Sequence, residues 1–157
     1  MAGAQPRPSG TETLLEDFAR VLGQTMGWPP TAGRTAGVLM LSEQPLTARE
    51  LQAEVGASAG SMSEITRLLI ENGVVRRFKV PGSRHFVHEW RPDAWVGCLE
   101  HQLRQVEALR DLAHRAAGTA GSLPASVAPR ARDMAGYYDF IVDRLGAVLE
   151  EYRGRVR

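Results

Sequence analysis

The chain has little of several residues that many classes of protein require. Cys98 is the only cysteine among 157 residues, so neither an intrachain disulfide nor a thiolate metal cluster can form. A reducing cytoplasm is therefore the simplest compartment. No apolar run approaches the ~18 residues that a membrane span needs, and the N-terminus has no signal-peptide pattern. Lys79 is the only lysine, so arginine carries nearly all of the positive charge.

The motifs of the common enzyme classes are missing as well. There is no glycine-rich phosphate loop, no HExxH pair, no nucleophile elbow and no pair of acids in a plausible cleft. Glu150 and Glu151 lie near the C-terminus, where solvation explains them. His85 and His88 differ by three positions, which places them on opposite faces of a strand, so a metal site is not expected. We expect no catalysis, no metal and no other cofactor.

The charge is distributed unevenly along the chain. The formal net charge is only +1, which excludes a general polycation. The segment from Arg76 to Arg91, however, carries four arginines and one lysine against a single acid, Glu89. Local basicity of this kind is what matters for binding nucleic acid. The hydrophobic content of 43% supports a real core in one domain with additional helices.

The most informative stretch begins at Leu46 and predicts two short helices. Thr47-Ala48-Arg49-Glu50 is a capping box, and Gly56 supplies the tight exit turn. Ser58 caps the second helix, predicted over about Ala59–Asn72. Four apolar residues share one face of this helix: Met62, Ile65, Leu68 and Leu69. The opposite face is small and polar: Gly60, Ser61, Ser63, Glu64 and Arg67. Thr66 fits the apolar side, four residues beyond Met62.

A basic hairpin follows the second helix. Residues 74–80 and 84–90 have strand composition, and Pro81-Gly82-Ser83 between them has turn composition. Leu46 is expected to pair briefly with this hairpin. A helix-turn-helix followed at once by a basic hairpin is a winged helix, whose natural partner is double-stranded DNA. The predicted fold class is mainly α with a small β-wing: a winged helix-turn-helix flanked by dimerisation helices.

These residues resemble a known family, the MarR-type winged-helix transcriptional regulators, and within it most closely the GbsR-like branch. The resemblance rests on the entry ASAGSMS, the run TRLLIENGVVRR and the wing turn PGSR, and it covers about Trp28 to Trp90. It implies a bacterial regulator whose terminal helices form a homodimer. The flanking helices match in pattern rather than in motif.

The predicted organisation has four parts. They are a disordered tail (1–10), an N-terminal dimerisation helix (11–27), the winged helix-turn-helix DNA-binding domain (28–91) and C-terminal dimerisation helices (92–157). Gly33 and Gly37, four residues apart, indicate close helix packing in preference to a ligand role. Two seams step by four and three residues, as in coiled coils. The first is Trp95, Leu99, Gln102, Val106, Leu109, Ala113 and Ala116; the second is Met134, Tyr138, Ile141, Leu145, Val148 and Tyr152.

The candidate DNA-binding residues lie on the second helix and on the wing: Ser58, Gly60, Ser61, Ser63, Arg67, Arg77, Lys79 and Arg84. Ser58 acts as a cap in any case. Arg84, just past the wing turn, is predicted to enter a minor groove, the alternative being a solvated hairpin arginine. Arg77 and Lys79 share a strand face and suit phosphates, whereas Arg76 is free to pair with an acid. Arg67 is the best candidate for reading a guanine.

The predicted function is sequence-specific transcriptional regulation by a cytoplasmic, nucleoid-associated homodimeric repressor on a pseudo-palindromic operator. By family analogy, a small-molecule effector would release it from a pocket formed by Trp28, Met40, Trp95 and Tyr138, all of which also suit the core. Cys98 suits either a redox sensor or, more simply, a small buried hydrophobic residue. The alternatives are a winged-helix protein–protein interaction module and a non-specific DNA-binding protein.

Overall fold

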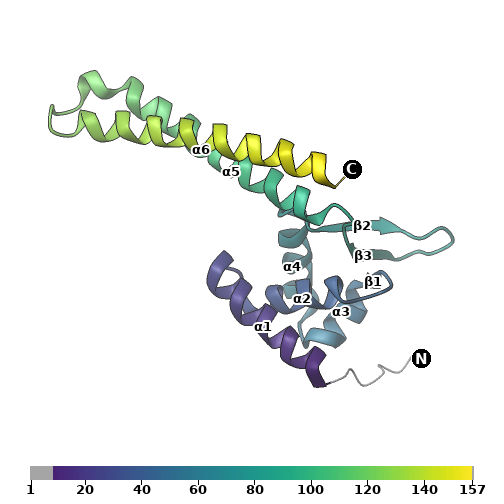
Figure 1. Cartoon of the computed structure of the whole chain (residues 1–157). Helices are drawn as coiled ribbons and strands as arrows, with labels where there is room; N and C mark the ends of the chain where they lie inside the picture. The colour runs from purple at the N-terminus through teal and green to yellow at the C-terminus, as the bar shows by residue number, and fades with distance from the viewer. Residues whose placement is uncertain (1–8, 157) are drawn as a thin grey trace. The chain divides into compact units, whose positions relative to one another are not determined.

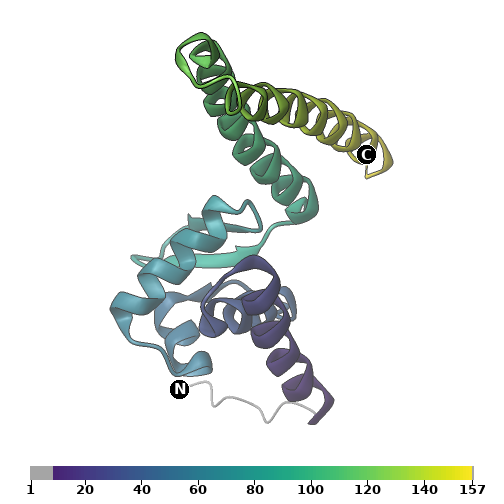
Figure 2. The ribbon, with the colours of Figure 1, turned by 90° about the vertical axis from the view of Figure 1, so that its left-hand side faces the viewer.

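The computed structural model describes residues 9–156 and divides the chain into two compact units. The first ends at Ala94 and the second begins at Trp95. The elements of the first unit are α1 (Ser9–Met26), α2 (Pro30–Met40), β1 (Leu46–Thr47), α3 (Ala48–Val55), α4 (Ala59–Glu71), β2 (Val75–Lys79) and β3 (Phe86–Trp90). Helix α5 (Ala94–Gly118), the 3-10 turn η1 (Ala120–Ser122) and α6 (Ala128–Arg155) follow (Figures 1 and 2).

Helices α1 and α2 pack closely because α2 has glycines where they meet. A Cβ atom on Gly33 would lie 2.6 Å from the carbonyl oxygen of Phe18, and one on Gly37 would lie 2.9 Å from the side chain of Leu15. Protein interiors do not accommodate such short contacts without moving the backbone. The packing role that the spacing of the two glycines indicated is therefore confirmed.

Side-chain caps define the two helices of the helix-turn-helix. Glu50 N donates to Thr47 Oγ1 over 3.2 Å, and Thr47 N donates to the Glu50 carboxylate over 2.7 Å, which completes the predicted capping box. Gly56 ends α3 in the left-handed region, with φ of 69°. Ser61 N donates to Ser58 Oγ over 3.2 Å at the start of α4. All three local predictions are confirmed.

Helix α4 lies with one face in the core of the first unit. Met62 and Leu69 are fully buried, Ile65 is nearly so, and Leu68 is half-buried at the edge of this face. Thr66 is buried too, and its hydroxyl donates to the carbonyl oxygen of Met62 over 2.9 Å, which satisfies it inside the core. The same core receives apolar side chains from the surrounding elements: Leu15, Ala36, Val38, Leu39, Leu51, Val75 and Val87.

The three strands form an antiparallel sheet in the order β1-β3-β2. Leu46 pairs with His88, so the expected brief pairing with the wing is confirmed. The strands are shorter than the sequence predicted, because the chain turns earlier. Ser83 N donates to the carbonyl oxygen of Val80 over 3.0 Å, and Gly82 takes a φ of 83°. Residues 80–85 therefore form the loop at the end of the wing.

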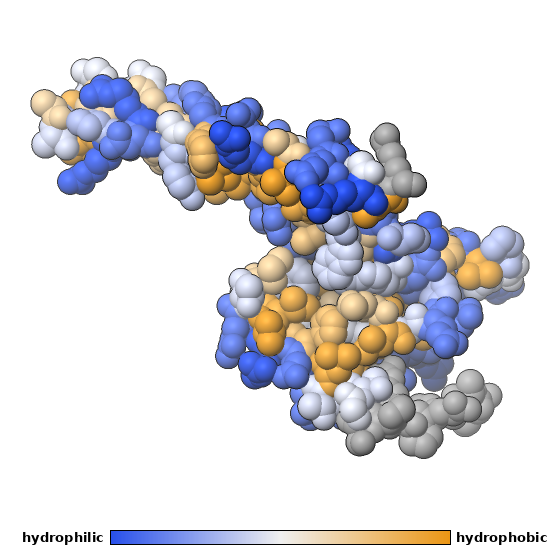
Figure 3. Space-filling view, viewed as in Figure 1, coloured by the Kyte–Doolittle hydropathy of each residue, from blue (hydrophilic) through white to orange (hydrophobic). Residues whose placement is uncertain are grey.

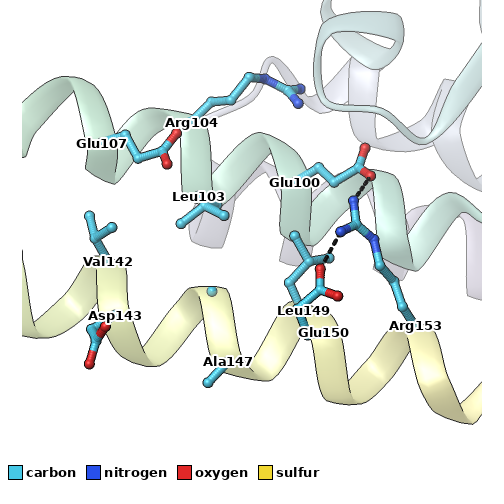
Figure 4. A pocket seen from close by; sticks show the side chains of 11 residues that line it. Glu100, Leu103, Arg104, Glu107, Val142, Asp143, Ala147, Leu149, Glu150 and Arg153 are labelled. Atoms are coloured by element: carbon cyan, nitrogen blue, oxygen red, sulfur yellow. Dashed lines mark hydrogen bonds and ion pairs between the residues drawn. The ribbon is translucent and has the colours of Figure 1, made fainter.

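The second unit has a thin core. Among the described residues, its buried apolar side chains are mostly small: Val96, Ala113, Ala120, Ala128, Ala135 and Leu149. Leu103 and Val142 point into the space between α5 and α6 (Figure 4). Arg153 joins the two helices, since its guanidinium donates to Glu100 over 2.5 Å and also binds Glu150.

Element boundaries differ from the sequence-based ones in several places. Of the tail predicted for residues 1–10, residues 1–8 lie outside the described residues, whereas Ser9 and Gly10 belong to α1. Helix α5 begins at Ala94 because Arg91 and Asp93 form a bidentate ion pair in the preceding turn, at 2.9 and 2.7 Å. The connection expected to be irregular contains η1, and α6 begins at Ala128, two residues early.

Replacing Gly33 with alanine tests the α1–α2 contact. We expect Gly33→Ala to lower the free energy of unfolding by about 1–3 kcal/mol, because the new methyl group meets backbone atoms of α1. Gly60→Ala, in α4 of the same unit, is the control. Its Cβ meets nothing within 4 Å, so the better helix propensity of alanine should stabilise the protein by up to about 1 kcal/mol. Urea unfolding measures both. A Gly33→Ala protein as stable as the parent would show that the close approach is not needed.

Candidate nucleic-acid interface

The exposed face of α4 begins with a small, polar first turn and continues with two charged side chains, Glu64 and Arg67. Burial of Met62, Ile65 and Leu69 fixes the rotation of the helix, and 3.6 residues per turn then place Gly60, Ser63 and Arg67 outward. These three residues are exposed. Gly60 and Ser63 are small enough for another surface to approach the helix backbone. The hydroxyl of Ser63 can donate a hydrogen bond to a base edge or accept one from it.

Ser58 and Ser61 are placed differently from their neighbours. Ser58 is exposed but its hydroxyl is engaged as the cap of α4, as predicted. Ser61 is half-buried and lies at the edge of the exposed face, in a groove of about 360 Å³ that Pro29, Thr31 and Arg67 also line. A contact of Ser61 with the major groove of DNA therefore depends on how deeply the DNA enters beside α2. This contact stays a prediction.

The wing separates its cations by strand alternation. Arg76 forms an ion pair with Glu89, its cross-strand neighbour on β3, which confirms that Arg76 is the one paired with an acid. On the other face, the Arg77 guanidinium lies 3.7 Å and the Lys79 ammonium 4.9 Å from the ring centroid of Phe86. Cations over an aromatic face keep their charge and are held in place. Two cations on one face are thus available to an anionic partner.

The wing loop presents Arg84 to solvent. His85 N donates to Ser83 Oγ over 3.1 Å, which shapes the backbone around Arg84. Within residues 9–156, neither Arg67, Arg77, Lys79 nor Arg84 forms an ion pair with an acid. The structure thus brings the wing candidates together as uncompensated positive charge on an exposed hairpin, and their contact with DNA stays a prediction.

Sequence reasoning missed the residues at the base of the wing. His88 is only 4% exposed, and its Nδ1 atom has no hydrogen-bond partner. Burial lowers the pKa of His88, a hydrogen bond with the backbone of Leu46 partly offsets this, and the charge of Arg77 lowers the pKa further. Arg49 and Gln52 on α3 face the same depression as His88. Their proximity depends on the pairing of β1 with β3, for which Leu46 was the only local signal.

The residues proposed for an effector pocket lie in both units. Trp28 and Met40 belong to the first unit, and Trp95 and Tyr138 to the second. Met40 and Trp95 are exposed, at 40% and 51%, so the core alternative does not hold for those two. Trp28 lines a depression of about 580 Å³ between α1 and α2, together with Arg20 and Arg34. The effector pocket stays a prediction.

Cys98 is half-buried on α5, where Gln102 Nε2 lies 3.6 Å from its sulfur. Burial raises the pKa of the Cys98 thiol, and the contact with Gln102 only partly opposes this. A raised pKa reduces the thiolate fraction that reacts with oxidants, which favours the packing interpretation of Cys98 over redox sensing. Among the described residues, no three histidine, cysteine or acidic side chains come close enough to hold a metal ion.

Comparison with known proteins agrees with this geometry. Residues 93–155 match the sequence model of the MmpR5-like MarR family transcriptional regulators. The chain is 26% identical over 150 residues to the HTH-type transcriptional regulator MmpR5 of Mycobacterium tuberculosis, covering 93% of this chain and 91% of that protein. The chain thus resembles the MmpR5-like MarR family transcriptional regulators over its C-terminal helices, and MmpR5 itself over most of its length.

Two further comparisons give similar proteins. The HTH-type transcriptional repressor OpcR of Bacillus subtilis is 29% identical over 82 residues, which span 52% of this chain and 44% of OpcR. A crystal structure described as a transcriptional regulator superposes with a TM-score of 0.84 at 24% identity, covering 92% of this chain and 99% of that one. The mainly helical fold with a small winged sheet is thus confirmed. In the part of the chain that the structure describes, no helix has the length and apolar character to cross a bilayer.

The buried imidazole of His88 predicts a specific dependence of stability on pH. The unfolded chain takes up a proton at His88 near the ordinary pKa of about 6.5, whereas the folded protein resists it. The contribution of neutral His88 to the free energy of unfolding is therefore complete above about pH 6.5. It is lost as the pH falls below this value, by up to about 1.4 kcal/mol per pH unit. We expect the free energy of unfolding of His88→Gln to fall less between about pH 7.5 and 5 than that of the parent.

Denaturant unfolding at several pH values measures this difference. His85, His101 and His114 remain in both proteins, so their contributions cancel in the comparison. Equal pH slopes in the two proteins would contradict a depressed pKa at His88.

Proposed function

We propose that this protein belongs to the MarR family and is a sequence-specific DNA-binding repressor that acts as a homodimer on a pseudo-palindromic operator. The observation that carries the proposal is the small, hydroxyl-rich first turn of α4 beside a wing in which Arg77, Lys79 and Arg84 form no ion pair with an acid within residues 9–156. A first turn without long charged side chains lets α4 approach the major groove, and cations that no acid pairs with suit phosphates. Transcription is repressed because the bound protein occupies promoter DNA.

Each candidate residue has a distinct role in this proposal. Gly60 and Ser63 allow α4 to approach the base edges, and Arg67 reads a base, preferably guanine. Arg77 and Lys79 bind phosphates, which sets affinity and salt dependence but not sequence preference. Arg84 enters the minor groove beside the recognition helix. The N-terminus of α4, which Ser58 caps, contacts a phosphate through the positive end of the helix dipole.

The homodimer is supported by apolar surface in both units. In the second unit, Tyr137 and Phe140 on α6 are 59% and 57% exposed, and Leu112 on α5 is 46% exposed. In the first, Leu14 and Val21 on α1 are exposed, and hydrophobic side chains gather over this helix (Figure 3). Large apolar side chains gathered along helices mark an interface. Two winged helices related by a two-fold axis then read half-sites about 34–36 Å apart.

Two finer points complete the proposal. The motifs ASAGSMS, TRLLIENGVVRR and PGSR keep the GbsR-like branch as our finer family assignment. A small-molecule effector with different affinities for two conformations would release the operator. A DNA-binding repressor of this kind acts on the nucleoid, in the cytoplasm.

Fluorescence anisotropy on the DNA upstream of the protein's own gene, against a scrambled duplex, tests the proposal. We expect Arg67→Ala to weaken binding to the upstream DNA by about 1–3 kcal/mol and to spare the scrambled duplex, because only base reading distinguishes the two. Arg132→Ala, an exposed arginine on α6, is the control that should change neither affinity. Equal losses on both duplexes would show that Arg67 contacts the backbone only. Absence of binding even at low salt would contradict the proposal and favour a protein–protein module.

A charge placed on the apolar face of α6 tests the homodimer. We expect Phe140→Glu to dissociate the dimer at micromolar concentration, because a carboxylate buried in an apolar interface is left without a partner. Arg132→Glu puts the same carboxylate at an exposed polar position of the same helix and should leave the dimer intact. Sedimentation velocity reads the oligomeric state directly. A Phe140→Glu protein that is still dimeric would place the interface elsewhere.

A further inference from the structure

A depression of about 470 Å³ lies within the first unit, where the start of α3 meets the wing. Strand β1 contributes Thr47, helix α3 contributes Arg49 and Gln52, and the wing contributes Arg77, Arg84 and His88. The elements that bear these residues, β1, α3 and the β2–β3 hairpin, lie side by side in Figure 1. No aspartate or glutamate is among its lining residues.

The charge of this depression is positive and uncompensated. Within residues 9–156, the guanidinium groups of Arg49, Arg77 and Arg84 form no ion pair with an acid. The nearest acid in sequence, Glu50, is engaged, because its carboxylate accepts from both N and Oγ1 of Thr47 over 2.7 Å. Three arginines that line one depression, with no acid among the lining residues, favour a multiply bonded anion, for which the planar guanidinium is well suited.

The N-terminus of α3 adds donors to the same place. The capping box uses the N–H groups of Thr47 and Glu50. The N–H groups of Ala48 and Arg49, in the first turn, have no acceptor within the helix. They lie at the positive end of the helix dipole, and Ala48 also lines the depression.

His88 supplies the independent observation that points to a ligand. It is 96% buried, it lines the depression, and its Nδ1 has no partner. A buried polar atom without a partner is rare in folded proteins. The protonated ring donates from both nitrogens, so an anion beside Nδ1 would complete its hydrogen bonding while Leu46 remains the other partner.

The surroundings of His88 determine how an anion would act on its protonation. The charged and titratable groups near it are Arg49 and Glu50 on α3, Arg77 on β2, and Arg84 and His85 in the wing. Burial and the charge of Arg77 disfavour the protonated ring. A bound anion opposes both effects.

We propose that the depression at the base of the wing binds one phosphate group, held by Arg49, Arg77 and His88. The phosphate is a backbone phosphate of bound DNA, which rests on the proposed function, or a free phosphate that competes with DNA for the same arginines. In both cases Arg49 and His88 join the binding surface, although they lie outside the recognition helix and the exposed wing faces.

Nuclear magnetic resonance of the histidine side chains in the full chain tests the proposal. The ¹⁵N signals of the His88 ring are followed while inorganic phosphate, or the upstream duplex, is added at matched ionic strength with sodium chloride as the reference. We expect the His88 signals to move from the neutral toward the imidazolium pattern. The His88→Gln spectrum assigns the signals; if that variant does not fold, Gln variants of His85, His101 and His114 assign them by elimination.

Matched variants connect the spectral change to the depression. We expect Arg49→Gln, a change at an exposed side chain, to weaken the phosphate-induced or duplex-induced shift of His88 by about tenfold in affinity. Arg132→Gln removes an exposed arginine from α6 and should leave the shift unchanged. An Arg49→Gln protein that responds like the parent would overturn the assignment of the site.

The two additions distinguish the sources and separate this proposal from the proposed function. A response to both phosphate and duplex supports a site for free phosphate, and a response to the duplex alone supports a backbone phosphate. Duplex binding detected by anisotropy with His88 unchanged in both titrations overturns the phosphate site but leaves the proposed function intact. A response to phosphate without any duplex binding supports the site and overturns the proposed function. If the His88 signals do not change in either titration and anisotropy detects no duplex binding, both the phosphate site and the proposed function are overturned.

Discussion

The rotation of α4 about its own axis is the constraint on which the rest of the first unit depends. Met62, Ile65 and Leu69 recur at helical spacing and are buried, so only one rotation of the helix keeps all three out of water. That rotation turns Gly60, Ser63 and Arg67 outward. The caps at Ser58 and Gly56 set where the helix starts and how α3 leads into it. The composition of the exposed face is thus a direct consequence of packing on the buried one.

The two-residue alternation of a β-strand separates the charges of the wing. Successive side chains on a strand face opposite ways, so Arg76 meets Glu89 while Arg77 and Lys79 lie over Phe86. One face of β2 is thereby neutralised, and the other remains cationic although it is only one residue away. The phenyl ring holds the two cations without cancelling their charge. A one-residue slip in register would exchange the two faces, so the β2–β3 pairing determines which cations are available to an anion.

Interactions between residues close in the sequence could be predicted, whereas interactions between residues far apart could not. The capping box at Thr47, the glycine exit at Gly56 and the cap at Ser58 are local, and all are confirmed. The winged helix followed from adjacent local patterns. The convergence of Arg49 with His88 was missed, because it depends on β1 pairing with β3 across some forty residues. The half-buried position of Ser61 was missed for a similar reason, since it depends on the neighbouring α2.

The two long helices show where a periodic pattern reaches its limit. A heptad pattern predicts an apolar stripe but does not say which helix covers it. In the second unit, the enclosed residues are mostly alanines, whereas Leu112, Tyr137 and Phe140 remain in solvent. Helices of this length with so small a shared core gain stability when a second copy covers the remaining apolar side chains. If that copy is related by a two-fold axis, the same contact brings two winged helices into one molecule. Folding stability and the presence of two such units would then depend on one set of side chains.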